Sequence, residues 1–324
     1  MAGRRALFLA SPHPVAAAVM RGWLAGGNSI AAVWYPEQQR KGLERADRRL
    51  GLFAPQWSVS AGSGKHKIPI MLVPRMGAWN ARMEAIRQTG ADVLISVYFM
   101  NIVPEDVIEH FAGRSVNFHP APLPRYRGPS PIEAMIIDRT LADLSCMTVH
   151  VLDKGTDSGA IIGSSPVAFP PDGNLARHVL DLAKAARILT ETKLQDYLEG
   201  GISPVPQDEK LAHYVRIDQS DLALSAALTS DEAEWRLKTY GRKKYLYASG
   251  LGKTRVCGFS RKISAPTREP PRVGLLTVDL DLADARVRLK RRRPWTKHVR
   301  AIANYLMKVS VKDRTDKFDT SPGK

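Results

Sequence analysis

The sequence has few cysteines and no long apolar run. Of its 324 residues only two are cysteines, Cys146 and Cys257, which is too few for a disulfide framework and fits a reducing cytosol. No stretch approaches the roughly 20 consecutive apolar residues that span a bilayer. These absences argue against a disulfide-stabilised secreted protein and an integral membrane protein. We therefore expect a cytoplasmic protein without a membrane span.

Acidic residues are also scarce. The chain has 48 Lys and Arg residues against 32 Asp and Glu residues, a formal net charge of +16. Residues 1–100 and 251–324 carry +8 and +12, whereas residues 101–250 carry −4. Such a distribution would attract a polyanion such as nucleic acid, a nucleotide or a membrane surface. A solvated, solubilising surface explains it equally well.

Strand and helix patterns alternate along the first two thirds of the chain. Apolar runs predict strands, and apolar residues at helical spacing predict the helices between them. This order indicates an α/β fold with a mostly parallel sheet covered by helices on both faces. We expect this domain over residues 1–205. The predicted strands are residues 6–10, 29–35, 68–73, 91–98, 115–119, 146–152 and 160–169, and the predicted helices include residues 15–25, 80–89, 131–138 and 174–198.

A different pattern follows residue 205. Short strands with turns predict a smaller, basic, β-rich C-terminal domain over residues 206–310, in which the last two strands form a hairpin. Pro294 opens a terminal helix, and residues 311–324 are expected to be a disordered tail. The predicted strands are residues 245–249, 254–259, 273–280 and 285–289.

Three polar residues are candidates for catalysis. Asn117 and His119 are two residues apart on a strand, so both point to the same face where that strand enters a proline-rich loop. Asp157 lies in a Gly-flanked loop between two later strands. An amide can stabilise an oxyanion, an imidazole can move protons, and a carboxylate can raise the imidazole pKa. No Ser or Cys nucleophile accompanies them, which favours direct acyl transfer to an external amine.

Each of these residues alone has an ordinary structural explanation. His119 could be a structural histidine, Asn117 could hold a turn and Asp157 could cap a loop. His150, on the neighbouring strand, could be a core histidine with satisfied hydrogen bonds. No metal-ligating cluster is expected.

The stretches NFHPAPLPRYRG (117–128) and TVHVLDKGTDSGAII (148–162) resemble the signature of the folate-dependent formyltransferases. This family includes methionyl-tRNA formyltransferase, glycinamide ribonucleotide formyltransferase and the sugar-nucleotide N-formyltransferases. Its pattern is Asn-x-His, then Leu-Pro-x-Tyr-Arg-Gly, then Thr-x-His and Asp-x-Gly. The resemblance covers roughly residues 5–200 and implies a Rossmann-like three-layer domain.

The resemblance also implies roles for individual residues. Asn117 would hold the formyl oxygen, His119 would transfer a proton or stabilise the oxyanion, and Asp157 would tune His119. The formyl donor would be 10-formyltetrahydrofolate. Its expected binding residues are Val97, Tyr98, Phe99, Met100, Ile102, Leu152 and Thr156. The expected acceptor-side residues are Pro122, Leu123, Pro124, Tyr126, Arg127 and Gly128.

The acceptor remains open between two classes. One is a small-molecule amine such as an amino-sugar nucleotide, because enzymes with that acceptor resemble this chain in their catalytic domain and vary in the C-terminal part. The other is charged initiator tRNA, because the C-terminal segment is strongly basic. Two further readings are a hydrolase that releases formate and a non-catalytic basic binding protein on the same scaffold. The intact Asn117, His119 and Asp157 argue against the last.

Overall fold

The computed structural model describes residues 3–37, 40–73, 80–218, 220–240, 246–249, 251 and 254–291. Within them the chain forms two compact units. The first comprises the described residues up to Phe169 together with His178–Arg216, and the second comprises Pro170–Arg177 together with the described residues from Ile217 onward. The predicted terminal helix from Pro294 and the predicted tail over residues 311–324 lie outside the described residues.

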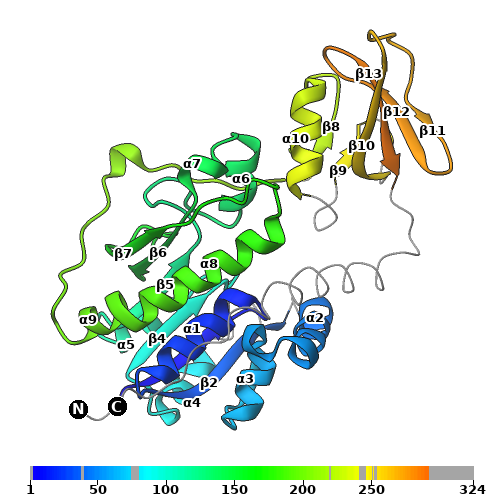
Figure 1. Ribbon diagram of the computed structural model, residues 1–324. Coiled ribbons are helices and arrows are strands. Elements are labelled where there is room, and N and C mark those ends of the chain that lie inside the picture. The colour runs from blue at the N-terminus through cyan, green and yellow to red at the C-terminus, as the bar shows by residue number, and fades with distance from the viewer. Residues whose placement is uncertain are drawn as a thin grey trace, which may run out of the picture. The chain divides into compact units, whose positions relative to one another are not determined.

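The first unit is built on a seven-stranded sheet (Figure 1). Its strand order is β3-β2-β1-β4-β5-β6-β7, parallel from β3 to β5 and antiparallel at β6 and β7. This arrangement confirms the predicted α/β fold with a mostly parallel sheet. The strands are β1 (Arg5–Ala10), β2 (Ser29–Pro36), β3 (Ile70–Val73), β4 (Val93–Val97), β5 (Ser115–His119), β6 (Cys146–Val151) and β7 (Ile161–Pro166).

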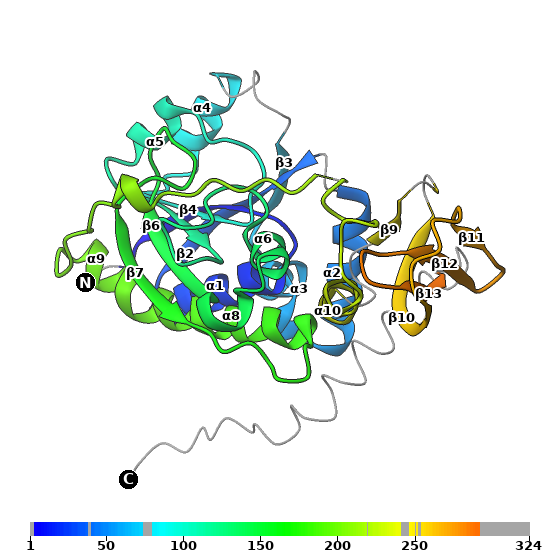
Figure 2. The same cartoon turned by 90° about the horizontal axis from the view of Figure 1, so that it is seen from above.

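Helices cover both faces of this sheet, as Figures 1 and 2 show. The central strands β1 and β4 are almost fully buried because both faces are covered. On one face, Leu7 and Leu9 of β1 pack with apolar residues of α4 and α5. The helices of this unit are α1 (Pro14–Ala25), α2 (Arg40–Phe53), α3 (Val59–Lys65), α4 (Asn80–Gln88), α5 (Glu105–His110), α6 (Pro131–Ile137), α7 (Leu141–Leu144), α8 (Leu175–Leu189, which belongs to this unit from His178 onward) and α9 (Gln195–Leu198), with short 3₁₀ turns at Pro55–Trp57 and Glu209–Leu211.

The helix predicted over residues 174–198 is interrupted by one π-helical segment, Thr190–Leu194, between α8 and α9. Thr190 and Thr192 each donate a side-chain hydrogen bond to the carbonyl four residues earlier, at 2.7 Å in both cases. Such bonds compete with regular backbone pairing inside a helix. Gly200, with a φ of +85°, follows the end of α9, in agreement with the predicted stop.

The second unit contains a six-stranded sheet of order β11-β12-β13-β10-β9-β8, with helix α10 (Ser230–Tyr240). The predicted β-rich character is confirmed, and β12 and β13 form the predicted hairpin. The single strand predicted over residues 273–280 was wrong: Gly274 donates to the Thr277 carbonyl and turns the chain between β11 and β12. The strands are β8 (Ala223–Leu224), β9 (Leu246–Ala248), β10 (Arg255–Ser264), β11 (Arg272–Val273), β12 (Thr277–Asp281) and β13 (Arg286–Arg291).

The first unit continues past the predicted boundary near residue 205 as far as Arg216. The reason is that residues 205–215 are hydrogen-bonded to that unit, at Pro124 and Arg127 in the loop after β5 and at Ile161, the first residue of β7. None of the helices in the described part of the chain is long and apolar enough to cross a membrane.

Candidate active site

The candidate site lies where β5 ends, in the antiparallel part of the first unit's sheet. Asn117 and His119 lie on one face of β5, and the side chain of Phe118 between them is buried in the core. This is the arrangement that the two-residue spacing predicts. The neighbouring strand β6 pairs Asn117 with His150 and His119 with Thr148. Thr148 also holds the start of the following loop, since its hydroxyl donates to the Ala121 carbonyl at 2.7 Å.

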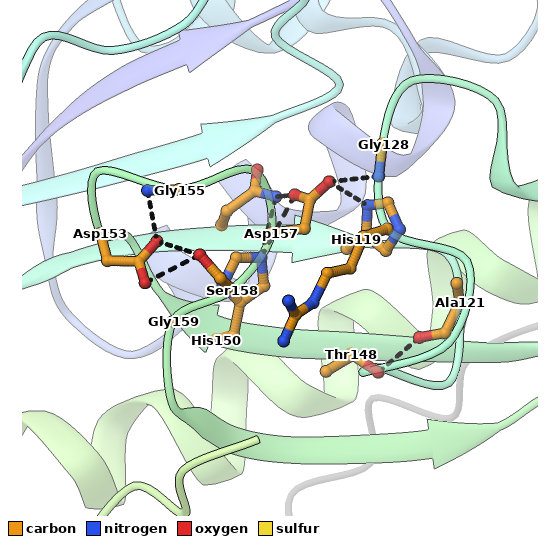
Figure 3. A network of polar contacts seen from close by, with 12 residues as sticks. His119, Ala121, Gly128, Thr148, His150, Asp153, Gly155, Asp157, Ser158 and Gly159 are labelled. Atoms are coloured by element: carbon orange, nitrogen blue, oxygen red, sulfur yellow. Dashed lines mark hydrogen bonds and ion pairs between the residues drawn. The ribbon is translucent and has the colours of Figure 1, made fainter. Parts of the chain in front are cut away.

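The loop between β6 and β7 brings Asp157 to the same place (Figure 3). Asp153 shapes this loop because its carboxylate accepts hydrogen bonds from the Gly155 N–H and the Ser158 hydroxyl. Gly159 is required where it stands, since a Cβ there would collide with the Val151 carbonyl. Asp157 itself has a φ of +53°, in the left-handed region that non-glycine residues seldom adopt. This unfavourable backbone conformation directs the Asp157 carboxylate toward β5.

The Asp157 carboxylate is the centre of the site (Figure 3). Its Oδ1 atom accepts from Asn117 Nδ2 at 3.1 Å and lies 3.5 Å from His150 Nε2. Its Oδ2 atom accepts from the Gly128 N–H at 2.9 Å and lies 3.5 Å from His119 Nδ1. The structure therefore brings together the three predicted catalytic side chains, which are separated by up to 40 positions in the chain.

His119 is held in one orientation. Its Nε2 atom lies 2.8 Å from the Tyr126 carbonyl oxygen, which can only accept, so a neutral ring carries its proton on Nε2. The Nδ1 lone pair then faces Asp157. Burial lowers the pKa of His119 below its ordinary value, against the opposing effects of the Asp157 carboxylate and the Tyr126 carbonyl. The ring is therefore neutral at pH 7 and has one nitrogen free to accept a proton.

Asp157 is ionised at the same pH. Burial alone would raise its pKa, but the His119 and His150 rings and the Gly128 N–H hold the pKa of this carboxyl well below its usual range. The N–H groups of Gly128 and Asn117 stabilise the carboxylate whether or not an imidazole is charged. A proton that arrives on His119 Nδ1 would thus meet a carboxylate already in place.

His150 belongs to the site, although a satisfied core histidine was the simpler expectation. The residue is 1% exposed, and its Nδ1 atom donates to the Val151 carbonyl at 2.8 Å. In a neutral ring Nε2 is then the acceptor, and it lies 3.2 Å from Asn117 Nδ2. The two Asn117 amide protons are thereby directed to His150 and Asp157. Only the pairing of β5 with β6 reveals this contact.

The predicted acceptor-side residues mainly build their own loop. Leu123, Tyr126, Arg127 and Gly128 are buried, and Pro122 and Pro124 are half-buried. The Tyr126 hydroxyl contacts Asp138 and Thr140 at 3.1 and 2.7 Å. The Arg127 guanidinium bonds to Glu209 and Gln207, the pair with Glu209 being 2.7 Å at its shortest. An anionic acceptor would have to displace Glu209 to reach this guanidinium.

The predicted donor-binding residues occupy the ends of β4 and β6. Val97 is fully buried in β4, so only its backbone is available to a ligand. Phe99 and Leu152 are partly buried against the same core cluster, while Met100 and Ile102 are 53% and 60% exposed. Tyr98 is half-buried with a φ of +53°, and Thr156 is exposed on the Asp157 loop. In the described residues, no three His, Cys, Asp or Glu side chains gather as a metal ion would require.

Comparisons with known proteins connect this geometry to one family. A family model described as formyl transferase matches residues 26–186, about half of the chain. A methionyl-tRNA formyltransferase from Bdellovibrio bacteriovorus is 29% identical over 195 residues, covering 59% of this chain and 61% of the relative. A second, from Halalkalibacterium halodurans, is 26% identical over 264 residues, covering 78% of this chain and 77% of the relative. The match thus spans less than two thirds of the Bdellovibrio relative's length.

Solved structures share the fold. A sugar 3N-formyl transferase named WlaRD, crystallised with dTDP and 5-N-formyl-THF, superposes with a TM-score of 0.58 at 15% identity, covering 90% of this chain and 98% of that one. An N-formyltransferase from Helicobacter canadensis, in complex with folinic acid and dTDP-3-aminofucose, has the same TM-score at 16% identity and covers 89% of this chain and 99% of its own. The match over residues 26–186 identifies this domain as a member of the formyl transferase family, and the solved structures show the shared fold.

Proposed function

We propose that this protein transfers a formyl group from 10-formyltetrahydrofolate to a primary amine, by direct attack and without a covalent acyl-enzyme. The observation that carries this proposal is the contact of Asp157 with both Asn117 and His119, in which His119 Nδ1 keeps a free lone pair. His119 contacts the Tyr126 carbonyl and the Asp157 carboxylate rather than a serine or cysteine side chain. Family membership and the relatives' names support the same reaction.

The donor-side residues fit a folate. Met100 and Ile102 expose apolar side chains in the segment after β4, and Phe99 and Leu152 are partly buried against the core cluster. An aromatic ring can pack on such a surface while backbone groups of the loops around Tyr98 and Thr156 meet its polar edge. Two solved relatives of the same fold contain 5-N-formyl-THF or folinic acid, which supports this assignment. The bound folate would supply the formyl group.

The three central side chains then have distinct roles. Asn117 turns one amide N–H from His150 or Asp157 toward the formyl oxygen, where negative charge develops. His119 accepts the proton of the attacking amine on Nδ1 and passes a proton to the leaving nitrogen as the old C–N bond breaks. Asp157, 3.5 Å away, stabilises the imidazolium in between. His119 is 5% exposed, so bulk water competes poorly for this proton.

We favour a small amine, such as an amino-sugar nucleotide, as the acceptor. The two sugar N-formyltransferase structures share the fold over about nine tenths of this chain. In the second unit, Arg286 and Arg288 are bonded to Asp281 and Asp279, which neutralises part of the basic charge on β13. Charge that is already paired offers less to a polyanion.

Charged initiator tRNA is the second candidate acceptor. The observations that favour it are the methionyl-tRNA formyltransferase relatives and the charge of +12 over residues 251–324. The two candidates differ in their response to salt. Transfer to tRNA would weaken steeply with ionic strength because phosphate contacts release counterions, whereas transfer to a small amine would change little.

One assay tests the reaction and separates the acceptors. The purified chain would be supplied with 10-formyltetrahydrofolate and, in turn, a dTDP-amino sugar, glycinamide ribonucleotide or methionyl initiator tRNA, at two salt concentrations. We expect formylation of a small amine, and its loss in His119→Ala but not in the exposed His66→Ala control.

Each other outcome would count against part of the proposal. Formylation of tRNA alone would overturn the acceptor, and formate release without an acceptor would indicate a hydrolase. Folate binding without turnover on any acceptor would favour a non-catalytic binding protein. Absence of folate binding would overturn the proposed function as a whole.

A further inference from the structure

One segment outside the sequence signature touches both loops of the site. Residues 205–215, here called the strap, pair with Ile161 through Val205 and with the loop after β5 through His213 and Val215. Val205 and Ile161 exchange two backbone hydrogen bonds of 2.8 Å. The Arg127 N–H donates to the His213 carbonyl at 2.8 Å, and the Val215 N–H donates to the Arg127 carbonyl at 2.7 Å.

Gln207 is the residue of the strap that joins the two loops through its side chain. Its Nε2 atom donates to the carbonyls of Asp157 and Gly159, at 2.8 and 2.7 Å. Its Oε1 atom accepts from Nε and Nη2 of Arg127, at 3.1 and 2.9 Å. Both donors and both acceptor positions of the amide are therefore used. A side chain that only covered the surface would not need four such partners.

The two loops that Gln207 joins hold His119 from its two sides. Tyr126, the neighbour of Arg127, has a φ of +60° and presents its carbonyl to His119 Nε2. Asp157, with a φ of +53°, presents its carboxylate to His119 Nδ1. Left-handed backbone at non-glycine residues persists only where the surroundings enforce it. Gln207 bonds directly to the backbone of one of these residues and to the neighbour of the other.

We propose that Gln207 is a positioning residue for His119. By holding the Asp157 carbonyl and the Arg127 guanidinium at a fixed separation, it keeps the Tyr126 carbonyl on Nε2 and the Asp157 carboxylate beside Nδ1. This selects the imidazole tautomer that is protonated on Nε2 and has its Nδ1 lone pair beside Asp157. The inference rests on the proposed function for its catalytic consequence, whereas its structural part concerns the folded protein alone.

The kinetic test compares Gln207→Leu with the wild type. The change removes all four hydrogen bonds at similar volume, so His119 should lose its fixed orientation. We expect kcat to fall by about 10²-fold, with KM for both substrates within about two-fold, because no ligand-binding contact is removed. Gln207→Glu keeps the acceptors for Arg127 but loses the two donors, and should be impaired as well. Lys210→Ala, an exposed change on the same strap, is the control and should leave kcat unchanged.

The structural test is independent of turnover. Imidazole ¹⁵N NMR of the full chain, titrated with pH, should show His119 of the wild type and of Lys210→Ala as a single Nε2–H tautomer. In Gln207→Leu the signals should move toward a mixture of tautomers, with the His119 pKa closer to its ordinary 6.5 because water reaches the ring. His150 and Asp157 are the titratable groups that face this ring.

The outcomes separate the two proposals. If His119 signals and titration are the same in Gln207→Leu, while thermal unfolding shows the variant to be folded, the positioning role is wrong. A variant that does not fold would be replaced by Gln207→Glu in the same titration. If the wild type transfers no formyl group but its His119 tautomer still depends on Gln207, the proposed function fails and the positioning role stands.

Discussion

His119 Nδ1 lies 3.5 Å from Asp157 Oδ2, while the opposite nitrogen of the ring is hydrogen-bonded to a backbone carbonyl. In the proposed mechanism the imidazole is therefore a base that accepts a proton on Nδ1, and the Asp157 carboxylate stabilises its protonated form. The His119 ring must be neutral before it can accept a proton from the attacking amine. The pH dependence of the reaction should therefore report the His119 pKa.

Activity should fall on the acidic side as His119 becomes protonated. Burial lowers the His119 pKa below its ordinary value, so kcat/KM should stay high down to pH values below about 6.5. Asp157→Asn removes the carboxylate that raises this pKa, so the acidic limb should move to lower pH while the plateau falls by about 10²-fold or more. A pH–rate profile of both proteins checks this. An acidic limb that does not move in Asp157→Asn would contradict the assigned pair.

Asn117→Ala should lower kcat more than it changes KM. The amide is the predicted donor to the developing oxyanion, and removing one such donor costs about 10²–10³-fold in kcat. Steady-state kinetics with saturating donor would measure it. Asn28→Ala, which alters an amide remote from the site, serves as the control, since Asn28 contacts Arg4 and Gln195. Near-full kcat in Asn117→Ala would show that Asn117 does not stabilise the developing oxyanion.

Gly128→Ala should damage both stability and activity. Gly128 has a φ of +105°, and a Cβ there would lie 2.5 Å from the Val215 carbonyl oxygen of the strap. The strained backbone and this collision should destabilise the fold by about 2 kcal/mol or more and withdraw the Gly128 N–H from Asp157. Gly64→Ala, where a Cβ would meet nothing within 4 Å, should instead be neutral or slightly stabilising. Urea unfolding of the two variants compares them, and equal stabilities would contradict the expectation.

Protonation of the buried His178 side chain should destabilise the folded protein in mild acid. Burial lowers the pKa of His178 to about 4, so the folded state binds its proton less readily than the unfolded state. The stability that this group contributes is present above pH 6.5 and is lost as pH falls from about 6.5 to 4, by up to about 3 kcal/mol. The free energy of unfolding at pH 7 and pH 4.5 should fall more in the wild type than in His178→Gln. The same fall in both would show that another group is responsible.

Much of the fold could be predicted from local patterns. The buried strands β1 and β4 stand out because both faces of a parallel sheet are covered, and their sequences are almost continuously apolar. The break between β11 and β12 was missed because a turn at Gly274 is decided by its bond to Thr277 rather than by hydrophobicity. The π-helical segment at Thr190–Leu194 was likewise invisible to a helical period.

The candidate site, like the fold, was predictable only in part from the sequence. The sequence by itself determined that Asn117 and His119 share a face, because side chains on a strand alternate with a period of two, and that Asp157 follows in a glycine-flanked loop. Only the tertiary structure decided where the His119 proton resides, that His150 touches Asn117, and that Arg127 is bound to Gln207 and Glu209. These contacts join residues up to 82 positions apart. No local pattern encodes them, because they depend on the path by which the strap returns across two loops.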